Sequence, residues 1–202
     1  MRLAMAAEKA SRNTRYNVIV APPSPMLGAV ASAVGIKVFS QTADMAVGEK
    51  TTGSLTPESI RAAGASGAIL NHSESMMTRK EIAGLVPRLG ALKLRVCVCA
   101  QTAREAAILA KFSLDYLAVE PRELIGSGIA ISRAKPQLVK QTVEATRSTG
   151  FEGQVLCGAG ILDGADVARA VELGADGVLV SSGIVKAKNW ETRIRELAAA
   201  LN

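Results

Sequence analysis

The chain has 202 residues, of which 49% are apolar and 21% charged, and this composition excludes a disordered chain, a collagen-like chain and a disulfide scaffold. The length predicts one domain over residues 1–202, and the low aromatic content of 3% argues against a base-stacking surface for nucleic acid. The formal net charge of +6 is compatible with a polyanion or with a small anionic substrate. Because Lys and Arg are scattered singly, the sequence favours a diffusely charged surface, and a phosphate-bearing small molecule fits this charge.

The three cysteines are Cys97, Cys99 and Cys157, and two of them alternate within an apolar run. This pattern predicts buried, reduced thiols and a cytoplasmic setting. A zinc site is not expected, because no second Cys pair follows Cys97-x-Cys99 and His72 is the only histidine. Charged residues interrupt the first twenty positions, and no run approaches the ~20 apolar residues of a membrane span, so we expect neither a signal peptide nor a membrane partner.

The chain opens with a predicted helix over Met1–Arg12, whose apolar residues share one face. Seven short runs rich in Val, Ile, Leu and Ala follow, without polar alternation. Such runs are typical of strands that are buried on both faces of a parallel sheet. They are Asn17–Ala21, Lys37–Gln41, Gly67–Asn71, Leu94–Ala100, Tyr116–Glu120, Gln154–Cys157 and Gly177–Val180.

The stretches between these runs have recognisable helix ends. Capping boxes are expected at Thr78-x-x-Glu81 and Thr102-x-x-Glu105, and Thr56 is expected to cap a helix whose first residue is Pro57. Asn189 is expected to cap the last helix, and Gly150 and Gly174 are expected to end helices. Seven strands alternating with eight helices predict an α/β fold. A closed (β/α)8 barrel needs eight strands, whereas an open doubly wound sheet can use seven, so the count alone leaves both open.

Ligands of such sheets bind at the carboxyl ends of the strands, where this sequence places several polar and small residues. His72 follows one run, at a probable helix start that disfavours the protonated ring. Glu120 ends another run that is otherwise apolar, and is either a buried ion-pair partner or a general base. The segment from Pro121 to Gly126-Ser127-Gly128 suits a mobile lid or an ordinary loop. The turns Gly158-Ala159-Gly160 and Ser181-Ser182-Gly183 allow backbone amides to approach a phosphate.

Together these motifs resemble the triosephosphate isomerase family, and the resemblance runs in order along essentially the whole chain. Asn71-His72-Ser73-Glu74 matches the family's catalytic-histidine motif, and Val119-Glu120-Pro121 with Ile125-Gly126-Ser127-Gly128 matches its glutamate and lid. The stretch Gln41…Thr52-Gly53 looks like its interface loop. Cys157-Gly158-Ala159-Gly160 and Leu179-Val180-Ser181-Ser182-Gly183 look like its short archaeal branch.

The resemblance implies a (β/α)8 TIM barrel and the interconversion of glyceraldehyde 3-phosphate and dihydroxyacetone phosphate in glycolysis and gluconeogenesis. It assigns catalytic roles to three side chains, with Glu120 as the base, neutral His72 polarising the carbonyl and Glu74 as a supporting carboxylate. It implies that phosphate is held by Ile125, Gly126, Gly160, Ser181 and Ser182. No metal or organic cofactor is expected, and the assembly typical of the branch is a homotetramer.

The resemblance also has two departures. Arg122 stands where the short branch usually has a second proline, and nothing matches the family's first strand with its Asn-x-Lys motif. We therefore expect seven of the eight barrel strands in this chain, with the N-terminal strand missing and isomerase activity impaired. Two alternatives remain, namely a non-catalytic phosphate-binding or assembly relic and another phosphosugar barrel enzyme.

Overall fold

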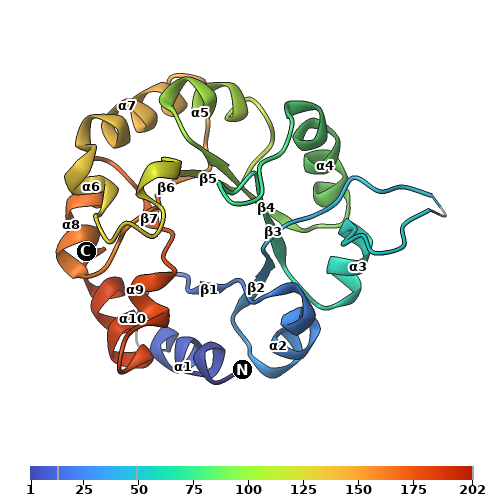
Figure 1. Ribbon diagram of the computed structural model, residues 1–202, viewed down its shortest axis with the longest axis horizontal. Helices are drawn as coiled ribbons and strands as arrows, with labels where there is room; N and C mark the ends of the chain where they lie inside the picture. Colours follow the sequence, from blue (N-terminus) through green and yellow to red (C-terminus); the bar gives the residue numbers. More distant parts are fainter. Residues whose placement is uncertain (13, 49, 202) are drawn as a thin grey trace.

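The computed structural model describes residues 1–12, 14–48 and 50–201, which form an α/β barrel-type fold. Within these residues, seven parallel strands are hydrogen-bonded in chain order, as predicted. Figure 1 shows the helices arranged around the strands. The strands are β1 (Ile19–Val20), β2 (Lys37–Ser40), β3 (Gly67–Leu70), β4 (Arg95–Ala100), β5 (Tyr116–Val119), β6 (Gln154–Cys157) and β7 (Gly177–Val178).

The described residues form ten α-helices and two short 3-10 helices, which is more than the eight helices expected from the sequence. The surplus arises because Pro136 starts a new helix after α6, and because a one-turn helix, α9, follows β7. The helices are α1 (Arg2–Ser11), η1 (Ser24–Met26), α2 (Leu27–Ala33), α3 (Pro57–Ala62), α4 (Arg79–Ala91), α5 (Ala103–Leu109), η2 (Arg122–Leu124), α6 (Ile131–Ala134), α7 (Pro136–Arg147), α8 (Gly164–Glu172), α9 (Ser182–Val185) and α10 (Trp190–Ala199).

The helix ends follow the local sequence closely, with one exception. Thr78 and Glu81 form the predicted capping box, and the predicted caps at Thr56 and Asn189 are present. Thr102 accepts a hydrogen bond from the backbone N–H of Glu105, but the Glu105 carboxylate accepts from the backbone N–H of Gln101 instead of completing a box. That carboxylate is turned toward the carboxyl end of β3.

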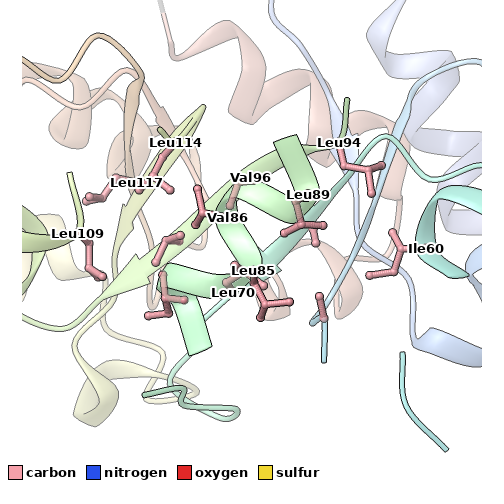
Figure 2. Packing of buried hydrophobic residues seen from close by; sticks show 14 of the residues in the cluster. Ile60, Leu70, Leu85, Val86, Leu89, Leu94, Val96, Leu109, Leu114 and Leu117 are labelled. Carbon is pink, nitrogen blue, oxygen red and sulfur yellow. The ribbon is translucent and has the colours of Figure 1, made fainter. Parts of the chain in front are cut away.

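The main core lies between the sheet and the helices around it. Leu85, Val86 and Leu89 on one face of α4 are buried against the sheet, as Figure 2 shows. A second group of side chains fills the inside of the strand ring and includes Phe39, Cys97, Cys99, Tyr116 and Ala118. All three cysteines are free and buried, as predicted.

The ring of strands has an opening between β7 and β1, because no ladder joins these two strands in the described part of the chain. The outer layer nevertheless continues across this opening, where α1 packs on α10 (Figure 1). Lys9 on α1 lies 2.9 Å from the carboxylate of Glu191 on α10, and the Tyr16 hydroxyl donates a 2.6 Å hydrogen bond to the carbonyl of Leu201. The ion pair joins the first and last helices, and the hydrogen bond joins the segments that follow them.

Candidate active site

The carboxyl ends of β3 and β5 bring together the histidine and the glutamate that the sequence singles out. His72 Nε2 lies 3.4 Å from Glu120 Oε2. The glutamate side chain is 4% exposed and the histidine side chain 25%, so the carboxylate is enclosed while the ring borders solvent. The pair therefore offers a shielded base beside a hydrogen-bonding imidazole that a small molecule can reach.

The backbone determines which nitrogen of His72 faces the glutamate as a donor. The backbone N–H of Glu74 donates a 3.2 Å hydrogen bond to His72 Nδ1, which therefore acts as an acceptor. A neutral ring with this partner carries its hydrogen on Nε2, the nitrogen that faces Glu120. The Glu74 carboxylate is 76% exposed and lies 3.7 Å from Nδ1, so Glu74 orients the ring chiefly through its backbone.

Asn71 holds the turn from which His72 projects. It adopts a left-handed conformation, with φ of 57°. Its side-chain amide donates to the carbonyl of Cys99 at 2.9 Å and to the carboxylate of Glu105 at 3.1 Å, and its Oδ1 accepts from the backbone N–H of Met77 at 2.9 Å. The side chain thus ties the ends of β3 and β4 to the loop that leads into α4.

We expect Asn71→Ala to lower the free energy of unfolding by about 2–3 kcal/mol, because it leaves buried polar groups without partners and strains the backbone. Asn71→Gly removes the same hydrogen bonds but tolerates the positive φ, so its loss should be smaller by about 1 kcal/mol. Urea unfolding of both variants measures the difference. Equal losses would show that the left-handed backbone carries no strain.

The Glu120 side chain is enclosed on several sides. Its Oε2 atom is buried and, within the described residues, has no hydrogen-bond partner. Burial raises the pKa of Glu120, whereas the charge on a protonated His72 and a hydrogen bond from the Cys99 thiol oppose that rise. Such a carboxylate is a stronger base than one in water, which suits proton abstraction from carbon.

The thiols near this carboxylate are held in their protonated form. Hydrogen bonding to Cys97 and burial raise the pKa of Cys99 well above its usual range. Burial raises the pKa of Cys157 to about 12. Neither thiol is therefore a nucleophile near neutral pH, because the thiolate is the reactive form.

The raised pKa of Glu120 gives a testable pH dependence of stability. A carboxyl whose pKa is higher in the folded state destabilises the fold when it is ionised, so the penalty grows as the pH rises and vanishes below the unfolded pKa of about 4.3. We expect Glu120→Gln to raise the melting temperature near pH 8, with each 1 kcal/mol gained adding about 2–4 °C, and to have little effect at pH 4. Calorimetry at both pH values tests this. A gain that does not depend on pH would contradict it.

The segment after Glu120 has the features expected of a lid. It runs from Pro121 through η2 to Ile129, and Gly126 and Gly128 have φ of 70° and 74° with open space where a Cβ would stand. Ile129 is 55% exposed. The residues that directly follow the segment are held in place by two hydrogen bonds. The Ser132 hydroxyl donates to the carbonyl of Asp166, and the backbone N–H of Ile131 donates to the carbonyl of Ala159.

The two small-residue turns lie close to this lid. Gly160 has φ of 72°, and a Cβ there would lie only 1.9 Å from the Ile129 carbonyl oxygen. Gly183 approaches the turn after β6 in the same way, since a Cβ there would lie 2.4 Å from the Ile161 carbonyl oxygen. Ile125, Ile161 and Ile184 belong to one apolar cluster, which places the lid and both turns together.

The predicted phosphate-binding residues therefore gather around this group. Ser181 precedes α9 and Ser182 begins it, so the first amides of this turn have no acceptor within the helix. In the part of the chain that the structure describes, no hydrogen bond or ion pair joins these turns to the His72–Glu120 pair. Gly158 connects the two groups, since it adjoins Glu120 and precedes Gly160 by two positions.

Three residues contribute to the site in ways that the sequence does not predict, namely Asn71, Cys99 and Gly158. A Cβ at Gly158 would lie 2.5 Å from Glu120 Cγ and 2.6 Å from its Oε1, so the missing side chain makes room for the carboxylate. Asn71 could have been suspected, because Asn at a strand end tolerates a left-handed turn. The contacts of Cys99 and Gly158 depend on which strands are neighbours.

Comparison with known proteins adds independent evidence. The sequence profile of triosephosphate isomerase matches residues 2–197. The triosephosphate isomerase of Caldivirga maquilingensis is 45% identical over 201 residues, which cover 100% of this chain and 89% of that protein. The chain belongs to the triosephosphate isomerase family. The family enzymes of Cenarchaeum symbiosum and Methanocaldococcus jannaschii are 43% and 41% identical, covering 99% and 98% of this chain and 89% and 90% of those proteins.

Membership of the triosephosphate isomerase family agrees with the resemblance based on the motifs and does not favour another phosphosugar barrel enzyme. The similar proteins come from archaea, as the predicted branch implies. Among the described residues, no helix is both long enough and apolar enough to span a membrane.

Proposed function

We propose that Glu120 and His72 carry the reaction of this chain, which is the interconversion of glyceraldehyde 3-phosphate and dihydroxyacetone phosphate. Family membership supports the reaction, and the 3.4 Å contact between His72 Nε2 and Glu120 Oε2 supports the assignment of roles. The substrate class is a small phosphorylated triose. We propose that residues 1–202 belong to one barrel domain.

In the proposed mechanism, the Glu120 carboxylate removes a proton from the carbon next to the substrate carbonyl. The same carboxylic acid then returns the proton to the neighbouring carbon. A carboxylate with a raised pKa is well matched to this double role, because it binds the proton readily and releases it again.

His72 would act on the oxygen atoms of the substrate. With Nδ1 accepting from the Glu74 backbone, its Nε2–H is free to donate to the carbonyl oxygen as negative charge develops there in the enediolate. A neutral imidazole is suited to this step, because it can donate a hydrogen and take one back without leaving a strong acid beside the base.

The phosphate group is proposed to bind among Ile125, Gly126, Gly160, Ser181 and Ser182, chiefly through backbone amides. The lid and the two turns share one apolar cluster, so closure of the lid would bring its amides to those of the turns. Closure would also exclude water and prevent loss of phosphate from the enediolate.

The Asn-x-Lys motif of the family has no counterpart in residues 1–202, so a cationic contact to the substrate is absent from this set. We propose that a form carrying this motif on an additional strand turns over faster than the 202-residue chain. A turnover assay on both forms tests this proposal, and equal rates would contradict it.

We also propose a cytoplasmic homo-oligomer. The three free, buried cysteines support a reducing compartment. Met45 and Val47 in the predicted interface loop are 37% and 65% exposed, which supports a partner at that loop. Light scattering would give the oligomeric state, and a monomer would contradict this part of the proposal.

The test of the catalytic proposal is His72→Gln, which retains a hydrogen-bond donor but loses the imidazole. We expect kcat to fall by about 10²-fold with a small change in KM, since the lost interaction acts in the transition state. Lys93→Gln on the surface is the matched control. Unchanged turnover in His72→Gln would reject these roles, and an inactive parent chain that still binds inorganic phosphate would favour the non-catalytic relic.

A further inference from the structure

The turn that follows β6 has a strained backbone. Ala159 and Gly160 both adopt a left-handed conformation, with φ of 73° and 72°. A residue with a Cβ is disfavoured in this region, so such a turn persists only where the surrounding contacts determine its shape. Because Gly160 belongs to the set proposed to bind phosphate, the contacts that hold this turn also set the position of its amides.

A buried carboxylate on α8 holds the far end of the turn. The Asp166 side chain is 3% exposed, and its Oδ2 accepts from the backbone N–H groups of Leu162 at 2.9 Å and of Asp163 at 3.4 Å. The carbonyl of the same residue accepts a 3.0 Å hydrogen bond from the Ser132 hydroxyl. A buried carboxylate is costly unless it is paired, so its other oxygen needs a cation.

Arg133 supplies that cation from α6, which comes directly after the lid and packs beside α8 (Figure 1). Its Nε lies 2.5 Å from Asp166 Oδ1, and a terminal nitrogen lies 3.4 Å from Asp163 Oδ1. The Arg133 side chain is 56% exposed, so the guanidinium reaches the buried carboxylate from the surface. One planar group with several donors can serve both carboxylates at once and stays charged at any pH of interest.

We infer that Arg133 is a positioning residue for phosphate binding, which acts through Asp166 to hold the turn from Gly158 to Leu162 in its strained shape. The backbone hydrogen bond from Ile131 to Ala159 ties the same turn to the end of the lid, so Arg133 also fixes the lid relative to the turn. The inference rests on the phosphate site of the proposed function. It gives Arg133 no contact with the substrate.

This role concerns only the phosphate end of the substrate. Among the described residues, no hydrogen bond or ion pair joins Arg133 or Asp166 to His72 or Glu120. Chemistry on a triose that lacks phosphate should therefore not depend on the pair, whereas a fault in the general fold would affect every substrate.

The experiment compares the parent chain with Arg133→Met, which keeps a long apolar stem but removes the charge. Inorganic phosphate, titrated by calorimetry, should bind about tenfold more weakly to the variant, which is the cost of one hydrogen bond to a charged group. For glyceraldehyde 3-phosphate, kcat/KM should fall by about the same factor, chiefly through KM, because phosphate is bound alike in the ground state and the transition state.

The second substrate is glyceraldehyde, the same triose without phosphate. Its deuterium uptake in D₂O, followed by NMR, should stay within about twofold of the parent rate, as expected for a change that is not coupled to the reacting groups. Arg169→Met on α8 is the matched control, because Arg169 pairs with Glu172 on the same helix, and it should change none of these measurements. Should Arg133→Met fail to fold by circular dichroism, Arg133→Gln takes its place with the same expected results.

The outcomes separate this inference from the proposed function. Equal losses with both substrates would show a general role in the fold and overturn the inference, and so would unchanged phosphate affinity in the variant. Phosphate binding does not require turnover, so this measurement decides the question even if the parent chain isomerises slowly. A parent chain that does not bind inorganic phosphate would overturn the proposed phosphate site, and the inference with it.

Discussion

Replacing Glu120 by Gln is expected to lower kcat/KM by about 10²–10⁴-fold, because the amide has nearly the shape of the carboxylate but cannot accept the proton from carbon. The side chain is already enclosed and makes no hydrogen bond through Oε2 in the described structure, so the loss should come from chemistry and not from broken packing. The variant should remain folded and should melt at a higher temperature than the parent near pH 8.

Steady-state kinetics with glyceraldehyde 3-phosphate measures the loss, and equilibrium binding of inorganic phosphate separates chemistry from binding. Phosphate affinity should stay within about twofold, since no hydrogen bond or ion pair among the described residues joins Glu120 to the residues proposed to hold phosphate. Glu172→Gln on α8 is the matched control, because this carboxylate is exposed and pairs with Arg169 away from the site. Turnover close to that of the parent in Glu120→Gln would exclude Glu120 as the base.

Gly158→Ala is the second change with a large expected effect. Its Cβ would lie 2.5 Å from Glu120 Cγ and 3.0 Å from Cδ, so the carboxylate must move to make room. A displacement of about 1 Å at a reacting group can cost about 10²-fold in rate, and we expect a fall in kcat of that order. KM should change less, because the residues proposed to hold phosphate are not displaced directly.

The control for this variant is Gly90→Ala on α4, where no atom lies within 4 Å of the added Cβ. Combining Gly158→Ala with Glu120→Gln tests the route of the effect. If Gly158 acts by positioning Glu120, the double variant should be no slower than Glu120→Gln alone. A further loss of 10²-fold in the double variant would show that Gly158 acts on something else.

The sequence alone predicted the seven strands and most helix ends, because these depend on local patterns. Apolar runs without alternation marked all seven strands, and Thr78 and Asn189 marked helix starts through their side-chain oxygens. Only half of the capping box predicted at Thr102 is present. The Glu105 carboxylate does not accept from the Thr102 backbone N–H, because it accepts from the backbone N–H of Gln101 and from the side-chain amide of Asn71 instead. Only the folded arrangement places Asn71 within reach of that carboxylate.

The candidate site could be predicted only in part, because several of its contacts join residues that are far apart in the sequence. His72 and Glu120 stood out because polar residues at the ends of apolar runs are unusual. The room that Gly158 provides for Glu120 depends on the neighbouring positions of β5 and β6, which the chain order suggests but does not show. The tautomer of His72 depends on a turn that brings the Glu74 N–H back to the ring.

The joined outer layer has a consequence for the order in which the molecule folds. Among the described residues, each strand pairs only with the strands next to it in the chain, so ladders can form without long-range closure. We expect them to begin where they are longest, between β3, β4, β5 and β6. The Tyr16–Leu201 hydrogen bond closes a loop of 185 residues, which carries the largest entropic cost of any contact described here. The meeting of α1 with α10 is therefore a late event, and amide exchange should report opening there before the central strands unfold.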